Sequence, residues 1–482
     1  MADRTVSLIE IEDVTFSYTS QRHEPALRNL DCSIEQGSFV GITGLAEAGK
    51  SSLCRLTSGY IPHFFHGEFS GRVSVAGTDT RETTIGELAE RVGFVFENPF
   101  DQLTGASLTV LEEAAFALES MGLARVEIRP RTQKSLAQVG MEDLADRHPQ
   151  RLSGGQSQRL ALASVLAVQP EIFILDEPTS QLHPLGVEEV FDVISDMHCR
   201  GYTVILVSQD LDHLATRADR LIVVDKGEIK WDGEPRNVLL EAAGARHHIL
   251  IPDVLEISRS LRAAGRIAST SPLPLTVEQA AEELSSIDGR VSAAEAIAAS
   301  ESSRPLPASK DSNNELLFED VHYDYPTGVS AIRGVSLSLD EGCVCIVGQN
   351  GAGKTTFAKH LNGLLRPTRG RVLVRGKDTR EYRVAEGIKL LGYLVGHLVQ
   401  EGKLVIVVTH DVKFAARHAD RVIALHHGTV LLDDDPRAVF GQDKALARTH
   451  VEPTAVTRLG KLLGLDETLL STEELLAILT PQ

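Results

Sequence analysis

The sequence is poor in the features that mark secreted or membrane-spanning proteins. It holds five cysteines among 482 residues, an odd number without zinc-binding spacing. Cys343 and Cys345 alternate within an apolar, strand-like run, so we expect them to be small core residues in a reducing cytosol. No apolar run approaches about 18 residues, and the opening MADRTVSLIEIED contains no apolar signal stretch. These absences predict a soluble, intracellular protein.

Basic residues are outnumbered by acidic ones. The chain carries 48 basic and 67 acidic residues, a formal net charge of −19. Surfaces that bind nucleic acid are normally basic, so nucleic acid is not expected as a partner. Hydrophobic residues make up 42% of the chain, which is enough to bury one or more sizeable cores. At this length, two to four domains are expected.

An internal repeat organises the chain. GRVSVAGTDTRE (71–82) returns as GRVLVRGKDTRE (370–381), 299 residues later. GYTVILVSQD (201–210) returns as GKLVIVVTHD (402–411), only 201 residues later. The separation therefore falls by 98 residues, and the second copy lacks a counterpart to roughly residues 97–194 of the first.

Short apolar runs alternate with helical stretches in both copies. Runs such as SFVGITG, EIFILDE and YTVILVS are bounded by Gly or acidic residues, which is typical of strands in a parallel sheet. The pattern predicts an α/β fold built from βαβ units. We expect a first domain at 1–243, a helical extension and flexible linker at 244–315, a second domain at 316–445, and a C-terminal helical extension at 446–482.

A phosphate-binding motif occurs at the same place in each copy. GLAEAGKS (44–51) and GQNGAGKT (348–355) each follow an apolar strand and open an expected helix. Glycine amides in such a loop surround phosphate oxygens, the lysine neutralises the β- and γ-phosphates, and the next hydroxyl can bind Mg²⁺. The residues assigned to nucleotide binding through this motif are Gly44, Gly49, Lys50, Ser51, Ser52, Gly348, Asn350, Gly351, Gly353, Lys354, Thr355 and Thr356. An ordinary Gly-rich turn is the alternative, and the repetition of the motif argues against it.

Two carboxylates end a later apolar strand, EIFILDEP (171–178). Asp176 could hold Mg²⁺ through water, and Glu177 could polarise a water molecule for attack on a γ-phosphate. On its own this pattern also fits a solvated strand end. Its place after a phosphate loop favours the catalytic interpretation.

The run LSGGQ (152–156) lies between these two motifs. The Ser153 hydroxyl and the amides of Gly154 and Gly155, at a helix start completed by Gln156, would form a second anion site suited to a γ-phosphate from another subunit. The order phosphate loop, LSGGQ, LDEP and late strand resembles the nucleotide-binding domains of ATP-binding cassette (ABC) transporters. IPHFFHGEFSG (61–71), the DQL of ENPFDQL and the fused tandem layout resemble cobalt-type ATPases of the energy-coupling factor (ECF) importers.

This resemblance implies two ABC-type P-loop NTPase domains, with a helical subdomain in the first copy only. It implies an Mg²⁺-dependent ATPase at the cytoplasmic face of the membrane, peripheral to it, with transmembrane and substrate-binding subunits as partners. The cargo would be a vitamin or metal ion. The further roles it implies are adenine stacking by Tyr18 and Tyr325, γ-phosphate contact by the switch residues Gln209 and His410, catalysis by Glu177 and His410, and Mg²⁺ binding by Ser51, Glu97, Asp176 and Thr355.

The first copy departs from the family pattern at several positions. Glu97 stands where the family has Gln, His183 where it has Asp, and Gln209 where it has the switch His. Glu47 replaces a glycine of the phosphate loop and adds negative charge there. Glutamine can donate a hydrogen bond but cannot become cationic. This copy is therefore expected to bind ATP but to hydrolyse it poorly.

The second copy keeps its phosphate loop and His410 but lacks the glutamine loop, helical subdomain, signature and Walker B carboxylates. In the family's sheet order the strand before His410 lies beside the phosphate-loop strand, so that pair would survive. We expect the loss to expose a sheet edge and to destabilise the second domain.

Neither nucleotide site within one chain is complete, so two chains could pair through their first copies and exchange signatures. A degenerate nucleotide-binding regulator without efficient hydrolysis remains an alternative. A soluble twin-cassette protein of the ribosome is a weaker one, because residues 252–305 hold eight acidic and only five basic residues.

Overall fold

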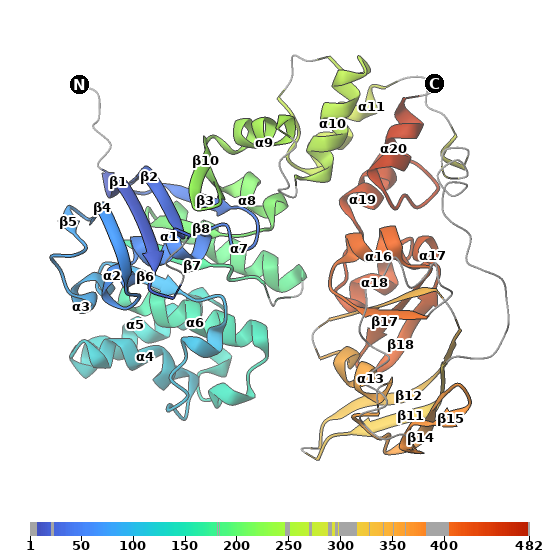
Figure 1. Cartoon of the computed structure of the whole chain (residues 1–482). Helices are drawn as coiled ribbons and strands as arrows, with labels where there is room; N and C mark the ends of the chain where they lie inside the picture. The colour runs from blue at the N-terminus through green and yellow to red at the C-terminus, as the bar shows by residue number, and fades with distance from the viewer. Residues whose placement is uncertain are drawn as a thin grey trace. The chain divides into compact units, whose positions relative to one another are not determined.

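The chain forms two compact units, Met1–Pro252 and Asp253–Gln482, in the computed structural model (Figure 1). The structure describes residues 7–20, 24–180, 182, 184–245, 251–268, 272–287, 292–294, 297, 316–326, 328–340, 342–349, 351–361, 363–381 and 404–480. His183 and Asn350, both singled out from the sequence, lie outside the described residues.

Unit 1 contains two sheets. Their strands are β1 (Ser7–Tyr18), β2 (Leu27–Glu35), β3 (Phe39–Thr43), β4 (Gly67–Val75), β5 (Thr78–Asp79), β6 (Val92–Val95), β7 (Ile172–Asp176), β8 (Thr203–Val207), β9 (Arg220–Asp225) and β10 (Glu228–Gly233). The first sheet has the order β2-β1-β4-β5 and is antiparallel. The second has the order β10-β9-β3-β8-β7-β6, and all of its pairs except β9–β10 are parallel.

The parallel sheet arises from the apolar runs seen in the sequence. Every residue of β3, β7 and β8 is buried, as expected for central parallel strands covered on both faces. β3 leads directly into the phosphate loop, and β7 ends in Asp176. Because the carboxyl ends of parallel strands meet at one edge of a sheet, this order brings the loop and the carboxylate to the same edge.

The helices of unit 1 cover this sheet and add a separate helical layer. They are α1 (Lys50–Thr57), α2 (Tyr60–His63), α3 (Ile85–Ala89), α4 (Val110–Ser120), α5 (Arg125–Gln138), α6 (Gly154–Val168), α7 (Pro184–Cys199), α8 (Leu211–Arg217) and α9 (Pro235–Gly244). α4, α5 and α6 pack on one another around a small apolar cluster of their own. The helical subdomain expected in the first copy is present.

Unit 2 repeats the two-sheet plan with fewer strands. Its described strands are β11 (Leu316–Asp324), β12 (Ser330–Leu339), β13 (Cys343–Val347), β14 (Arg369–Val374), β15 (Lys377–Asp378), β16 (Val405–Val408), β17 (Arg421–His426) and β18 (Thr429–Asp434). The sheet orders are β12-β11-β14-β15 and β16-β13-β17-β18. β16 pairs in parallel with β13, so the strand before His410 does lie beside the phosphate-loop strand, as predicted.

β16 is the edge of its sheet among the described strands. Its counterpart β8 is flanked by β3 and β7 and is fully buried, whereas β16 is only half-buried and Val408 is 37% exposed. No described strand of unit 2 takes the places of β7 and β6. An open edge of apolar residues is what the missing stretch of sequence predicts. Lower stability of this domain stays a prediction.

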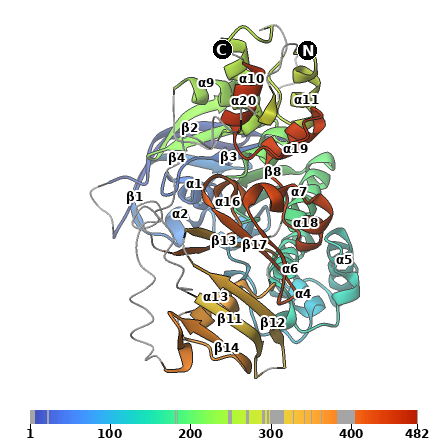
Figure 2. The same ribbon diagram turned by 90° about the vertical axis from the view of Figure 1, so that its right-hand side faces the viewer.

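The helices of unit 2 include segments from both copies of the repeat. They are α10 (Asp253–Ala263), α11 (Val277–Ser285), α13 (Lys354–Leu361), α16 (Val412–His418), α17 (Pro436–Phe440), α18 (Asp443–Thr449), α19 (Ala455–Leu462) and α20 (Thr472–Leu479). Figures 1 and 2 show α10 and α11 beside α19 and α20. α11 packs on α19 and α20 packs on α10, so each extension contacts the other through both of its helices.

These four helices form one apolar core, and we call them the helical module. Its buried residues include Ile257 and Leu261 of α10, Leu284 of α11, Leu459 of α19 and Ile478 of α20. Each helix is amphipathic, with apolar residues three or four apart, so a short isolated extension could not cover its own apolar face. The sequence predicts an extension in each copy; the structure shows that the two extensions bury each other.

A histidine is buried in the helix that follows the second phosphate loop. His360 of α13 is fully buried, and its Nδ1–H donates to the Thr356 carbonyl oxygen over 2.7 Å. Its ring packs edge-on against Tyr323. Nε2 is also buried and has no hydrogen-bond partner among the described residues. Burial lowers the pKa of His360, and the Thr356 carbonyl opposes this only in part.

We therefore expect unit 2 to lose stability on acidification. An unfolded histidine has a pKa of about 6.5, so below that pH the unfolded chain binds more protons than the folded one, and the free energy of unfolding falls. His360→Leu, which copies the buried Leu56 of unit 1, should make this loss smaller. It should also raise the free energy of unfolding at neutral pH by about 1 kcal/mol, because the unpaired Nε2 is removed. Unfolding followed from about pH 7.5 to 5.5 tests this; an unchanged pH dependence in the variant would contradict it.

Candidate functional site

The phosphate loop of unit 1 is closed by its own lysine. Lys50 is buried, and its Nζ donates to the carbonyl oxygens of Gly44 and Leu45 over 2.9 and 2.8 Å. Gly44 has φ 152°, and a Cβ there would lie 2.2 Å from the Val224 carbonyl oxygen. Only glycine fits that position, because the loop backbone passes close to the backbone of β9 there.

Unit 2 repeats this geometry. Lys354 Nζ donates to the carbonyl oxygens of Gly348 and Gln349 over 2.6 and 3.0 Å. Burial lowers the pKa of Lys354 to about 8. Burial removes water from around the ammonium group, and a phosphate in this loop would place negative charge beside it and favour its protonated form.

The loops differ at one left-handed position. Gly351 has φ 81° with nothing within 4 Å of an added Cβ, whereas Glu47 holds the same position in unit 1 with φ 61°. A left-handed conformation costs a non-glycine residue about 1 kcal/mol. The Glu47 side chain is exposed beside the loop and places a negative charge near the expected phosphates.

Two orphaned carboxylate oxygens lie beside the loop of unit 1. Asp176 is 6% exposed, its side chain interacts with Ser51, and its Oδ1 is buried without a hydrogen-bond partner among the described residues. Burial raises the pKa of Asp176, although the Ser51 hydroxyl, Arg55 and Lys50 act in the opposite direction. A buried carboxylate with a free oxygen beside a hydroxyl is a set of oxygen ligands that suits Mg²⁺.

Glu177 follows in a strained conformation, with φ 47°. The backbone N–H of Gln209 donates to Glu177 Oε2 over 3.4 Å, while Glu177 Oε1 is buried without a partner among the described residues. Burial raises the pKa of Glu177, and Lys50 and Gln209 lower it only in part. A carboxylate with a raised pKa and one open oxygen is suited to accept a proton from water.

The two candidate base-stacking tyrosines are tied to the helix behind each loop. The Tyr18 hydroxyl lies 3.0 Å from Ser52 Oγ, and the Tyr325 hydroxyl lies 3.0 Å from Thr356 Oγ1. Each ring also packs edge-on against the aromatic residue two positions before it in the sequence. Both tyrosines therefore stand next to a phosphate loop; their contact with adenine stays a prediction.

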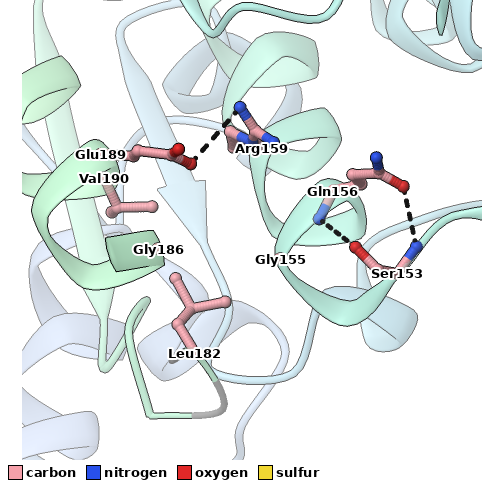
Figure 3. A pocket seen from close by; sticks show the side chains of 8 residues that line it. All are labelled: Ser153, Gly155, Gln156, Arg159, Leu182, Gly186, Glu189 and Val190. Atoms are coloured by element: carbon pink, nitrogen blue, oxygen red, sulfur yellow. Dashed lines mark hydrogen bonds and ion pairs between the residues drawn. The ribbon is translucent and has the colours of Figure 1, made fainter. Parts of the chain in front are cut away.

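The LSGGQ residues form the start of α6. Ser153 caps the helix: its Oγ accepts from the Gln156 amide, and Gln156 Oε1 accepts from the Ser153 amide (Figure 3). The amides of Gly154 and Gly155 lie in the first turn, where a helix offers no acceptor for them. A hollow of about 210 Å³ opens between this turn and α7. Its lining residues are Ser153, Gly155, Gln156, Arg159, Leu182, Gly186, Glu189 and Val190.

The remaining predicted residues are more dispersed. Gln209 is exposed after β8 and reaches Glu177. His410 is exposed after β16, where Asp411 caps α16. Glu97 is exposed after β6, and no contact joins it to Asp176 or Ser51 in the described part of the chain.

One functional candidate was missed. Gln102 accepts from the Phe96 amide over 3.3 Å and donates to the Ala161 carbonyl and the Ser164 hydroxyl of α6. It therefore fastens the loop after β6 to the signature helix. The only sequence signal was its place in the phrase DQL, which says nothing of its partners in α6.

Comparison with known proteins shows the family. The family model for ABC transporters matches residues 27–180 and 332–449. The chain belongs to the ABC transporter family. It carries two ABC ATPase cassettes, one in each unit, and the ABC-type P-loop NTPase fold predicted from the sequence is confirmed. It is an ATP-binding component of this family, and the assignment as an ATPase is confirmed at family level.

Two relatives carry the provisional name of ABC transporter ATP-binding protein. One, from Caldanaerobacter subterraneus, is 36% identical over 80% of this chain and 67% of its own length. The other, from Methanosarcina acetivorans, is 30% identical over 563 aligned positions, 95% of this chain and 91% of its own length. Among solved structures, cbiO1 of Clostridium perfringens, part of the ABC transporter complex cbiONQ, is 29% identical over 54% of this chain and 97% of its own, with a TM-score of 0.45. Among the described helices of this ABC protein, none has both the length and the apolar character needed to cross a membrane.

Proposed function

We propose that this chain is the ATP-hydrolysing subunit of an ECF-type importer for a small nutrient, a vitamin or a metal ion. One observation carries the proposal: Lys50, Ser51, Asp176 and Glu177 converge at one edge of the parallel sheet in unit 1. The ECF assignment is supported by the phrases IPHFFHGEFSG and DQL.

Hydrolysis would use the residues of unit 1 as follows. The Lys50 ammonium would exchange its two loop carbonyls for β- and γ-phosphate oxygens. Ser51 and Asp176 would hold Mg²⁺, which neutralises charge developing on the phosphates. Glu177 would orient the attacking water and accept its proton through the open Oε1. The Gln209 side chain would donate to the γ-phosphate as a neutral substitute for a switch histidine.

Unit 2 would bind nucleotide without hydrolysing it at a useful rate. Lys354 makes the same contact with its phosphate loop as Lys50 does in unit 1. The described sheet of unit 2, however, ends at β16, whereas the sheet of unit 1 continues past the matching strand β8 to β7, which carries the carboxylates. The alignment with the Methanosarcina relative supports an internal gap, because it spans 563 positions and this chain has only 482 residues. Losing one well-placed electrostatic group commonly costs about 10²–10³ in rate.

The signature at Ser153 would then serve a nucleotide held by another cassette. Pairing of two chains through their first cassettes would join each signature to a loop that has both carboxylates. A degenerate regulator is the second candidate, favoured by Gln209 and by the charge and strain of Glu47 in the loop. It would bind ATP but show no turnover even with membrane partners present.

A groove in unit 1 is where we propose that a transmembrane subunit docks. The groove, about 200 Å³, lies between β6 and the α4–α6 helical layer and is lined in part by Tyr60, Gln102 and Phe116. Aromatic residues make up only 5% of the chain, yet Phe64, in ring contact with Tyr60, is 68% exposed and Phe100 is 65% exposed. Such exposed aromatic surface is typical of an interface. Docking there would hold the protein peripherally on the cytoplasmic face of the membrane.

The function is tested by ATP turnover of the purified chain, alone and with its membrane partners. Lys50→Ala should abolish turnover, because unit 1 holds both carboxylates. The matched substitution Lys354→Ala should leave turnover within a few-fold of wild type. An equal loss of turnover in both variants would contradict the proposal that unit 1 hydrolyses ATP and unit 2 does not. Binding of ATP without any turnover would support the regulator instead.

A further inference from the structure

Arg55 is held between two aromatic residues beside the first phosphate loop. It lies on α1, five residues after Lys50, with its guanidinium carbon 4.4 Å from the centre of the Phe65 ring. Its Nη1 donates to the Tyr18 hydroxyl over 3.2 Å. A planar guanidinium can stack on a ring and direct a hydrogen bond sideways at the same time, whereas an ammonium cannot.

Tyr18 is thereby held on several sides. Its hydroxyl meets Arg55 and Ser52, and its ring packs edge-on against Phe16 and Phe65. The backbone is close here as well: a Cβ at Gly67, which pairs with Tyr18, would lie 2.0 Å from the Ser17 carbonyl oxygen. The Tyr18 hydroxyl is therefore engaged by the protein, so a contact with a ligand would have to come from the ring itself.

Unit 2 lacks the arginine of this arrangement. The Tyr325 hydroxyl meets Thr356, but the residue five positions after Lys354 is Lys359, which is exposed. The two cassettes therefore hold their tyrosines differently, although both tyrosines lie next to a phosphate loop.

We propose that Arg55 is a positioning residue that holds the Tyr18 ring where it stacks on the base of a bound nucleotide. The proposal rests on the proposed function, since it presumes that the Lys50 loop binds ATP. Stacking on an aromatic ring stabilises a bound base, and it depends on how the ring is held. Without Arg55 the ring keeps Ser52 as its only hydroxyl partner among the described residues and can turn more freely.

The test compares a ligand that has a base with one that has none. Binding of Mg²⁺-ATP and of Mg²⁺-tripolyphosphate is measured by calorimetry on the full chain carrying Lys354→Ala, which silences the second loop. Arg55→Lys, which keeps the charge but not the planar stack, should raise the Kd for ATP about 3- to 10-fold. The Kd for tripolyphosphate should stay within twofold, because the phosphate loop is untouched.

Two further variants separate positioning from other roles. Tyr18→Phe keeps the ring and removes the hydroxyl, so it should reproduce the effect of Arg55→Lys, and the double variant should be no worse than either one. Lys359→Arg, the reverse change at the matched position of unit 2, should alter neither Kd.

Three results would overturn the proposal. An equal loss for both ligands would place Arg55 on the phosphate and metal side, through its nearness to Asp176. Additive effects of the two substitutions would show that Arg55 does not act through the Tyr18 hydroxyl. No change in either Kd would show that the stack is only structural. Failure of the premise that the Lys50 loop binds ATP would look different, because the parent protein would then bind neither ligand.

Discussion

Glu177→Gln is expected to lower the kcat for ATP hydrolysis about 100- to 1000-fold while ATP still binds. The amide keeps the size of the side chain and its approach to the Gln209 backbone, but it cannot accept the proton of the attacking water. ATP affinity should be unchanged or slightly higher, because a negative charge near the γ-phosphate is removed. Single-turnover kinetics and calorimetry with Mg²⁺-ATP measure the two quantities separately.

The control lies at the other end of the same strand. Glu171 is exposed just before β7, and Glu171→Gln should leave kcat within about twofold, as is usual for surface changes. The acid limb of the wild-type pH–rate profile should lie above the ordinary range of a glutamate, because burial raises the pKa of Glu177. If Glu177→Gln kept wild-type turnover, the base would have to be another residue and the proposed mechanism would fail.

Leu459→Ala is expected to loosen helices that belong to the other copy of the repeat. Leu459 of α19 is fully buried in the helical module, and removing a buried leucine side chain costs about 2–5 kcal/mol. Because α11 packs on α19 and α10 shares the same core, amides in α10 and α11 should exchange with solvent at least about tenfold faster. Hydrogen exchange read by mass spectrometry reports this helix by helix.

The same helix supplies a matched comparison. Leu462 is 57% exposed, and Leu462→Ala should change the exchange of α10 and α11 very little. Unaltered exchange in α10 and α11 of Leu459→Ala would mean that the two extensions are stabilised separately, contrary to the shared core.

Much of the site was accessible from sequence because its signals are local. The loops around Lys50 and Lys354, the cap formed by Ser153 and Gln156, and the carboxylates after β7 each depend on a few consecutive residues. In each case a short run of chain sets both the backbone and the chemistry. The placement of the His410 strand beside the phosphate-loop strand was also predicted, from the sheet order of the family that the sequence resembles.

Residues whose roles depend on distant partners were not found in this way. Gln102 contacts α6 some sixty positions further along the chain. Arg55 donates a hydrogen bond to Tyr18, and the strands β2 and β3 lie between the two residues in the sequence. In the sequence, His360 looks like any other residue of a helix. Only the structure shows that its ring packs against Tyr323 and that its Nε2 is buried without a hydrogen-bond partner among the described residues. None of these contacts has a spacing rule, because each joins elements that meet only after folding.

Unequal activity of the two cassettes stays a prediction, but the sequence by itself determined that this protein has two phosphate-loop motifs, one LSGGQ run and one LDEP run. Covalent order is enough for that, since each motif is complete within a few residues. Only the tertiary structure decided that the two extensions share one core and that Arg55 donates a hydrogen bond to Tyr18. Each of these contacts joins residues that are far apart in the sequence. Burial of apolar surface and hydrogen bonding of buried polar atoms stabilise the fold whatever the sequence separation of the partners.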